Sequence, residues 1–280
     1  WIIGNSGMRN PWRMPSGFKV YVESNMVGKI RDADDQVAFK KILLDKGEIG
    51  GDEDKDVDAS ITRKYRLMFN KYGFAYPEVR KKDGFEQSEL VAVDAITPLG
   101  ETFYNADSVA AQQECFLRGL IVPMERLTET STFSPLLWVV TIMMELEKRT
   151  GDTKINFIEF ATCVQTTTPL YDVSEVVDEI LSIREERKKA ENKKKYDREL
   201  IDRKRERYLK QDTNFKDYAD MNIRYLVSAG IVKRAGRGMM LSPENHSMAI
   251  ELIKDTVSNV LLLDRYKKLC NGAPLPTDNQ

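Results

Sequence analysis

The chain has 280 residues, of which 41% are hydrophobic and 31% are charged, and its formal net charge at pH 7 is −1. This length can hold two or three small domains, and the hydrophobic content is that of a globular protein. No apolar run approaches the ~20 residues that a membrane-spanning helix requires, so we expect no membrane partner.

The cysteine and histidine content excludes several classes of enzyme. The three cysteines, Cys115, Cys163 and Cys270, are far apart and odd in number, which favours a reducing compartment and argues against a zinc site. His246 is the only histidine, whereas a Ser-His-Asp triad, a Cys-His pair or a histidine metal site needs a well-placed imidazole. The segment AGRG at 235–238 is too short to count as a P-loop or a GxGxxG motif.

Residues 1–20 are rich in glycine and proline, which predicts a loop-like arm rather than a long helix. Within this arm, Arg9, Asn10 and Arg13 are groups that can reach phosphates or base edges. Alternatively, the apolar side chains of the arm anchor it to a core and leave the arginines merely exposed. The sequence supports both interpretations equally.

A helix with an apolar face is predicted over residues 32–47, where Gly47 is a plausible stop. The acidic run 52–58 then has the alternating aspartates of a calcium loop. It lacks the glycine and the twelfth-position glutamate of such a loop, so an exposed loop is predicted. Glu53 and Lys55 fit part of a nuclease motif, but no apolar residues surround them to build the strand that would hold it.

Residues 61–98 follow the element order of a winged helix. A helical stripe ends at Gly73, two apolar stretches at 74–79 and 90–96 predict strands, and a basic turn with Lys81 and Lys82 lies between them. Thr97 and Pro98 form an N-cap followed by a proline at the first helical position. The side chains expected to face away from the core of the first helix are Thr62, Arg63, Lys64 and Arg66.

Residues 134–165 are the most apolar part of the chain. A buried helix is predicted from Pro135 to about Gly151, and a short helix is predicted at 156–165. Together with a third helix that begins at Asp172, this order resembles a helix-turn-helix. Carboxylates at the start of the third helix would repel phosphate, so the turn around Thr167 is the better candidate for DNA contact.

The stretch from Asp172 to Lys210 begins as an amphipathic helix and continues as a run of charge. Residues 184–207 contain 12 Lys/Arg and 7 Asp/Glu. If helical throughout, the stretch would be roughly 55 Å long. One interpretation is a charged helix exposed to solvent. The other is a strut that leads to the next subdomain and contacts phosphate on the way. The residues that would make this contact are Arg184, Arg187, Lys188, Lys193, Lys194 and Lys195.

The element order of residues 61–98 returns near the other end. A helix over 215–229 ends at Gly230, and short strands on either side of 233–238 enclose a basic turn, before Ser242-Pro243 opens the last helix. The turn contains Lys233, Arg234 and Arg237. Basic residues at both turns favour nucleic-acid binding, because a wing contacts the DNA backbone. The alternative is two unrelated helix–hairpin–helix units.

These patterns predict a mainly α-helical, multi-domain protein with small β-hairpins and winged-helix or helix-turn-helix subdomains. Three subdomains are predicted. Residues 1–125 contain the first winged-helix-like unit, and residues 126–212 form a helical subdomain that ends in the charged helix. Residues 213–280 form a linker subdomain with the second winged-helix-like unit.

Five segments resemble, in the same order, the N-terminal half of AlwI-type restriction endonucleases. They are WIIGNSGMRNP, FSPLLWVVTIMMELEKRTGDTKINFIEFATCV, EVVDEILSIREER, RYLVSAGIVKRAGRGMMLSPE and LCNGAPLPT. The resemblance covers nearly the whole chain, and the order and spacing of the segments make it specific. This family includes type IIS restriction enzymes and nicking enzymes, which bind a short asymmetric DNA site and cut a few bases to one side.

The resemblance implies a modular enzyme of the bacterial cytoplasm. Its N-terminal half would recognise double-stranded DNA through winged-helix-like subdomains, and a C-terminal nuclease domain would hold Mg²⁺ with carboxylates. The chain ends at Gln280, before such a domain would begin, so we expect a recognition part without a cofactor of its own. Cleavage would then need its own C-terminal nuclease domain or a separate nuclease subunit.

The functional prediction is therefore sequence-specific recognition of DNA. Phosphate contacts are expected from both wings and the charged helix, and base contacts from the Arg9–Arg13 arm and the Thr62–Arg66 helix. The alternatives are a winged-helix protein-interaction or transcriptional module, with the acidic loop 52–58 at its interface, and an intact nuclease within these residues. No catalytic or metal-binding residue is predicted. The predicted DNA-binding residues are Arg9, Asn10, Arg13, Thr62, Arg63, Lys64, Arg66, Lys81, Lys82, Thr167, Arg187, Lys188, Lys194, Lys233, Arg234 and Arg237.

Overall fold

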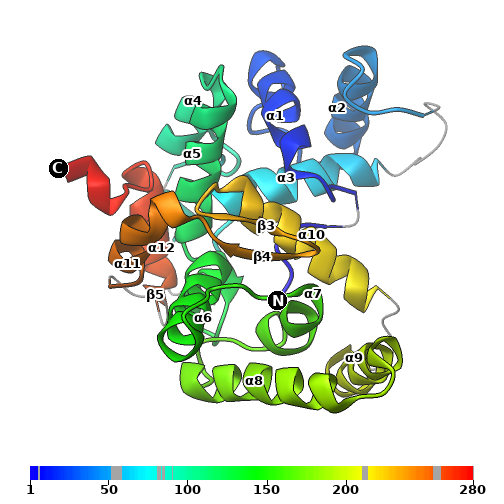
Figure 1. Ribbon diagram of the computed structural model, residues 1–280. Helices are drawn as coiled ribbons and strands as arrows, with labels where there is room; N and C mark the ends of the chain where they lie inside the picture. Colours follow the sequence, from blue (N-terminus) through cyan, green and yellow to red (C-terminus); the bar gives the residue numbers. More distant parts are fainter. Residues whose placement is uncertain are drawn as a thin grey trace.

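The helical periodicity and short apolar strands of the sequence become a mainly helical fold with two small antiparallel sheets (Figure 1). The computed structural model describes residues 1–5, 7–51, 59–80, 83, 86–89, 91–209, 214–254 and 260–279. The predicted fold class, mainly α with small hairpins, is confirmed. Within these ranges, no helix is both long enough and apolar enough to cross a membrane.

Five helices make up the first part of the chain and the upper part of Figure 1. They are α1 (Met14–Glu23), preceded by the 3₁₀ turn η1 (Pro11–Arg13), α2 (Ala33–Asp45), α3 (Ser60–Tyr72), α4 (Pro98–Tyr104) and α5 (Val109–Ile121). Both α2 and α3 lie where helices are predicted. Gly73 ends α3 with a φ of 75°, a conformation that glycine adopts easily. Thr97 caps α4 as predicted, because its Oγ1 accepts a hydrogen bond from Gly100 N at 2.9 Å.

The prediction of a loop through residue 20 is wrong from Met14 onward, where α1 begins. Pro15 lies in the first turn of α1, where the helix does not need its N–H group. Gly17 faces the ring of Tyr65 so closely that a Cβ atom would lie 2.2 Å from that ring. The proline and the glycine therefore serve a helix start and a close helix contact rather than a loop.

Within the described residues, the segments predicted as strands at 74–79 and 90–96 pair over a much shorter stretch than expected. Among the described residues of this segment, the pairing is limited to an isolated bridge between Ala75 and Ile96. Asp94 turns the chain with a left-handed φ of 62°, and its buried carboxylate accepts a hydrogen bond from Arg66 Nε at 2.7 Å. Three backbone hydrogen bonds join the two segments beside this ion pair: from Tyr76 N to Ala95 O, from Asp94 N to Tyr76 O and from Thr97 N to Phe74 O. The predicted wing residues Lys81 and Lys82 lie outside the described residues, as does the acidic run 52–58.

The apolar middle of the chain forms the predicted helices. They are α6 (Pro135–Thr150), α7 (Phe157–Glu159), the π-helical turn η4 (Phe160–Val164), α8 (Val173–Lys189) and α9 (Lys193–Leu209). Ser134 Oγ caps α6 by accepting from Leu137 N at 3.1 Å, and Gly151 ends it with a φ of 74°. Trp138 and its neighbours in α6 are buried, as predicted.

The charged stretch folds as two helices, so the prediction of one continuous strut is wrong. At Ala190 the ψ angle of 128° leaves the helical region, and α9 then lies across the end of α8 (Figure 1). The hydroxyl of Tyr196 donates to Glu186 Oε2 at 2.9 Å across the turn. Leu200 and Ile201 of α9 are buried. Burial of this apolar pair against the middle of the protein favours the folded-back arrangement over an extended solvated helix.

The last part of the chain contains the predicted second unit. Its elements are α10 (Phe215–Ser228), β3 (Val232–Ala235), β4 (Gly238–Leu241), η5 (Pro243–Asn245) and α11 (His246–Lys254). The strands β3 and β4 pair from Val232 with Leu241 to Ala235 with Gly238. The order of helix, glycine, hairpin and helix is therefore confirmed for this unit.

A second sheet joins the middle of the chain to its end. Its strands are β1 (Glu125–Arg126), β2 (Ser131–Phe133) and β5 (Val260–Leu261), and β2 lies between the other two. The chain then forms α12 (Leu262–Cys270) and η6 (Pro276–Asn279). In α12 the guanidinium of the buried Arg265 donates to Pro123 O at 2.5 Å and to Lys71 O at 3.2 Å. It thereby bonds Lys71 O, a carbonyl in the last turn of α3, where carbonyls lack a partner within the helix.

One cluster of buried apolar side chains includes members of all three predicted subdomains. Its aromatic centre includes Phe74, which stacks on Phe103 with centroids 4.0 Å apart, and Tyr72, which lies 6.0 Å from Tyr225 of α10. The division at residues 125 and 212 stays a prediction.

Helix α10 also anchors the N-terminal arm. Asn222 Oδ1 accepts from Ile3 N at 2.8 Å, and its Nδ2 donates to Gln165 Oε1 at 3.2 Å. The hydroxyl of Tyr225 donates to Met8 O. Ile3 and Met8 are fully buried. The arm is thus held along α10 by its backbone and its apolar side chains.

We expect Asn222→Ala to lower the free energy of unfolding by about 2 kcal/mol, because it leaves the buried Ile3 N–H without an acceptor. Urea denaturation of the variant measures this loss. Asn105→Ala is the control, since the Asn105 side chain only bonds Glu101 O of its own helix at an exposed position. Equal stability of the two variants would contradict the anchoring role of Asn222.

Candidate nucleic-acid interface

The exposed face of α10 carries a stripe of charged side chains. Its buried face, which includes Ala219, Asn222 and Leu226, fixes the rotation of the helix about its axis. Lys216, Asp220 and Arg224 therefore share the outer face, because residues four apart lie on one side of a helix. Asp217 lies beside them at the N-terminal end.

The N-terminal arm reaches this stripe from one side. Arg9 Nη2 lies 3.6 Å from Asp217 Oδ2, and both side chains are about half exposed. Asn10 Oδ1 accepts from Trp12 N at 3.2 Å and so caps η1. The predicted anchoring of the arm by apolar side chains is confirmed for Ile3, and Arg9 is exposed beside α10. Contact of Arg9 with DNA stays a prediction.

The β3–β4 hairpin reaches the stripe from the other side. Arg234 Nη2 lies 3.3 Å from Asp220 Oδ1, and its Nη1 donates to Arg237 O at 3.2 Å. The same Asp220 carboxylate bonds Arg224 at 2.8 Å. One carboxylate thus connects the arginine of the helix with the arginine of the hairpin, while Lys233 is exposed on β3.

The hairpin rests on the loop that precedes α7. Ile155 and Met239 exchange two backbone hydrogen bonds, each of 2.9 Å. Gly238 approaches this loop so closely that a Cβ atom would lie 2.1 Å from Ile155 O. The guanidinium of Arg237 lies 4.2 Å from the centroid of the Phe157 ring, a cation–π contact. These contacts join the hairpin to a loop that also lines a pocket.

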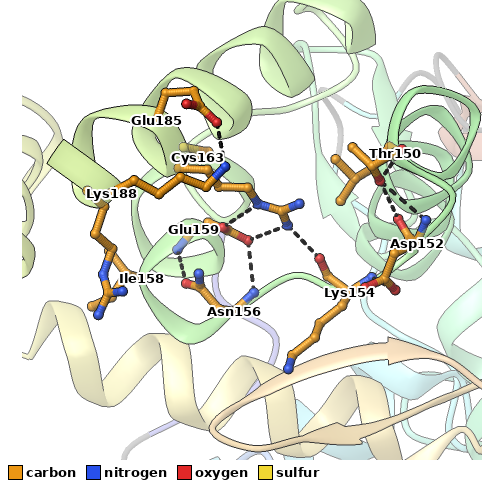
Figure 2. A network of polar contacts seen from close by, with 12 residues as sticks. Thr150, Asp152, Lys154, Asn156, Ile158, Glu159, Cys163, Glu185 and Lys188 are labelled. Carbon is orange, nitrogen blue, oxygen red and sulfur yellow. Dashed lines mark hydrogen bonds and ion pairs between the residues drawn. The ribbon is translucent and has the colours of Figure 1, made fainter.

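A polar pocket of about 350 Å³ lies between this loop and the junction of α8 with α9. The basic side chains that line it are Lys154, Arg184, Arg187, Lys188 and Lys193. Figure 2 shows the Glu159 carboxylate at the centre of the polar contacts, beside Asn156. The carboxylates of Asp152 and Glu159 also line the pocket, so its five cations are partly balanced by two anions.

A buried ion pair fixes the wall of this pocket. Glu159 is 1% exposed, and its carboxylate accepts from Arg184 Nε at 2.8 Å and from Arg184 Nη2 at 3.0 Å. Glu159 and Asn156 also form a capping box at the start of α7. The hydrogen bonds to Glu159 raise the pKa of the Arg184 guanidinium, so this arginine stays charged.

The basic side chains around this pocket are partly paired with carboxylates. Arg187 Nε donates to Asp197 Oδ1 at 2.7 Å, and Lys188 Nζ donates to Glu185 Oε1 at 2.7 Å. Lys194 is exposed at the start of α9. We call the cations of the arm, α10, the hairpin and the pocket together the basic belt. Its members are Arg9, Lys154, Arg184, Arg187, Lys188, Lys193, Lys194, Lys216, Arg224, Lys233, Arg234 and Arg237.

Two predicted contact residues face the interior. Thr62 Oγ1 donates to Gln36 O at 2.9 Å, and Thr167 Oγ1 donates to Cys163 O at 2.8 Å; both side chains are buried. Thr62 was expected on the outer face of α3, but the polar side of that helix packs on α2 here. A threonine hydroxyl that bonds a backbone carbonyl can be buried at little cost in free energy. The pattern of polar and apolar residues in the sequence does not reveal such a burial.

The other predicted residues of α3 and Arg13 are not members of the belt. Arg13 Nη2 donates to Glu48 O at 3.0 Å, Arg63 Nη1 donates to Gln36 Oε1 at 3.1 Å, and Arg66 bonds Asp94. Lys64 lies beside the arm, where Asn5 Nδ2 donates to its backbone oxygen at 3.2 Å.

The sequence reasoning missed Lys154 and the stripe of α10. A signal for the stripe was present, because Lys216, Asp220 and Arg224 recur every four residues in the helix directly before a basic turn. Lys154 carries no such signal. It joins the pocket only because the loop before α7 packs on the hairpin.

One protein family, described as AlwI restriction endonuclease, has a model that matches residues 70–280. This match defines the class as that of the restriction endonucleases, and it includes α10, the hairpin and the polar pocket. The chain belongs to the AlwI restriction endonuclease family. The comparison with curated proteins found no match.

Restriction endonucleases usually depend on Mg²⁺, which implies a site rich in carboxylates. In the part of the chain that the structure describes, no group of three or more His, Cys, Asp or Glu side chains could hold a metal ion. Glu159, the most buried carboxylate of the pocket, is taken up by Arg184 and by the cap of α7. The described residues therefore do not fit the metal of the family.

We expect Glu159→Gln to lower the free energy of unfolding by about 2 kcal/mol, because Arg184 loses its charged hydrogen-bond partner in a buried position. Thermal or urea unfolding measures the change. Glu185→Gln is the matched control: it removes an exposed carboxylate that bonds Lys188 one turn away. If both variants unfold like the parent, the pocket wall does not depend on Glu159.

Proposed function

We propose that this chain is the sequence-specific, double-stranded DNA-recognition part of a type IIS restriction or nicking endonuclease of the bacterial cytoplasm. In this proposal, cleavage belongs to a magnesium-dependent nuclease, either a C-terminal domain of the same protein or a separate subunit. The predicted subdomains 126–212 and 213–280 supply most of the belt, and 1–125 supplies the arm. The basic belt is the observation that carries the proposal.

The distribution of charge supports a polyanionic partner. The chain as a whole has a net charge of −1, yet twelve cationic side chains lie along the arm, α10, the hairpin and the polar pocket. Carboxylates lie among these cations, and the surplus of positive charge that remains attracts the phosphates of DNA. The carboxylates are those of Asp152, Glu159, Glu185, Asp197, Asp217 and Asp220. Five of these cations, Lys216, Arg224, Lys233, Arg234 and Arg237, lie on the hairpin and on the helix before it, which are the elements where a winged-helix protein would contact DNA.

The cations are presented on rigid supports. Asn222 and Tyr225 hold the arm on α10, and the Ile155–Met239 bonds hold the hairpin on the loop before α7. Contacts from fixed positions set the register of a protein on DNA, whereas mobile lysines give only general attraction. This rigidity favours specific recognition over non-specific binding.

A selection from random duplexes at moderate salt tests the proposal. We expect one short asymmetric sequence to be enriched, with a binding constant that falls steeply as salt rises, because phosphate contacts release counterions. Failure to enrich any sequence would overturn the proposal. Binding that depends little on salt would instead indicate a protein-interaction module.

We expect Lys233→Ala to weaken binding to all duplexes similarly and to reduce the slope of log K against log salt by roughly 0.9, the loss of one phosphate contact. Lys267→Ala is the matched control, since Lys267 is an exposed lysine of α12 outside the belt. An unchanged slope for Lys233→Ala would remove the hairpin from the interface.

We expect the chain alone to bind the selected duplex without cutting it in the presence of Mg²⁺. Gel analysis of both labelled strands after long incubation measures nicking and double-strand cleavage. Cleavage of either strand at a fixed distance from the site would contradict the assignment of catalysis to another domain or subunit.

A further inference from the structure

Helix α10 has the features of an element that reads bases. It directly precedes the basic hairpin, and its outer stripe of Lys216, Asp220 and Arg224 is accessible along two turns. The arm lies on one side of the stripe and the hairpin on the other. In Figure 1 the helix crosses the middle of the molecule beside the β3–β4 hairpin.

The dimensions and side chains of this helix suit the major groove of DNA. An α-helix with its side chains is about 10–12 Å across, and the groove is about 12 Å wide. The Arg224 guanidinium can donate two hydrogen bonds to O6 and N7 of a guanine. No other base presents two acceptors in this arrangement, so Arg224 would select a G·C pair.

Asp220 is difficult to explain as part of a surface that only attracts phosphate. Its carboxylate lies among Arg224, Arg234 and the other belt cations, where it reduces the attraction for DNA. It bonds Arg224 at 2.8 Å and lies 3.3 Å from Arg234. A carboxylate that holds two guanidinium groups restricts their rotamers, which lowers the entropy lost when they bond a base or a phosphate.

We propose that α10 enters the major groove and that Arg224 reads a G·C base pair, with Asp220 as the positioning residue for Arg224 and Arg234. The inference rests on the proposed function, because it assumes that the chain recognises DNA. It assigns base reading to α10 in place of the Thr62–Arg66 segment of α3. There, Thr62 is buried and Arg66 is committed to Asp94.

The chain offers a matched control pair for both residues. Arg31 bonds Glu78 at 2.8 Å, the same distance as between Arg224 and Asp220, and the Arg31 and Arg224 side chains are both 49% exposed. Glu78 is 47% exposed and Asp220 is 39% exposed. Arg31 and Glu78 are outside the basic belt, so their substitution reports the general effect of losing a surface charge.

The first experiment measures binding of Arg224→Ala and Arg31→Ala to the selected duplex, to its single base-pair variants and to a non-specific duplex. We expect Arg224→Ala to lose about 10- to 100-fold affinity for the selected duplex and only a few-fold for the non-specific one. Its preference for G·C should vanish at one position and persist at the others. Arg31→Ala should keep every preference.

The second experiment compares Asp220→Asn with Glu78→Gln. A positioning role predicts that Asp220→Asn binds the non-specific duplex more tightly, because a negative charge is gone, yet binds the selected duplex more weakly. A simple surface charge predicts that both affinities rise together, and that result would overturn the role of Asp220. Far-UV circular dichroism and urea unfolding confirm that each variant is folded before its binding is compared.

The outcomes separate this inference from the proposed function. If the parent chain enriches no sequence, the proposed function fails and the inference fails with it. If the parent enriches a site and folded Arg224→Ala keeps the full preference at every position, the proposed function stands and α10 is not the reader.

Discussion

The side-chain amide of Asn222 is the interaction on which the candidate interface depends. It is fully buried in α10 and bonds the backbone at both Ile3 and Trp1, as well as the side chain of Gln165. A side-chain amide has an oxygen that accepts and an NH₂ group that donates two hydrogen bonds. It can therefore bond several segments that no regular ladder connects. The arm, the end of η4 and α10 thus meet at one side chain. Together with the Tyr225–Met8 hydrogen bond, it fixes the position of Arg9 relative to Arg224 and Arg234.

A second buried polar group fixes the other end of the belt. Glu159 satisfies the start of α7 through Asn156 N and holds Arg184 of α8 in two hydrogen bonds. The loop before α7 also carries the hairpin, through Ile155 and Met239. The position of the hairpin relative to the polar pocket is therefore determined in the core and not at the surface. This is why a belt built from three distant parts of the chain can act as one surface.

The elements that local sequence signals define were predicted correctly. The predictions were wrong where contacts between distant residues determine the structure. Helix α6, with its Ser134 cap and Gly151 end, and the β3–β4 hairpin were predictable because caps, turns and periodicity lie within a few residues. In the described part of the first predicted hairpin, pairing is short, and Asp94 turns the chain and is buried against Arg66, which no alternation of apolar residues encodes. The charged helix was predicted as continuous because Leu200 and Ile201 show their role only when α9 folds back. Of the candidate site, the hairpin cations were predictable, but the neighbourhood of Arg9 and Asp217 was not, since these residues are far apart in sequence.

The ion pairs of the belt determine what DNA binding can gain from each cation. Arg9, Arg187 and Arg234 each lie beside a carboxylate in the free protein. A phosphate that approaches one of them must displace or share that carboxylate, so each such contact gains less than the contact of an unpaired lysine. Exposed pairs of this kind are worth only about 0–1 kcal/mol, so the exchange is readily reversible. Phosphate contacts therefore still add to affinity, but each paired arginine adds less than an unpaired cation would. Arginines that a carboxylate already orients lose little further side-chain entropy when they bond a base. In the proposed function, these ion pairs lower the affinity for DNA in general more than the affinity for a duplex that also offers base contacts.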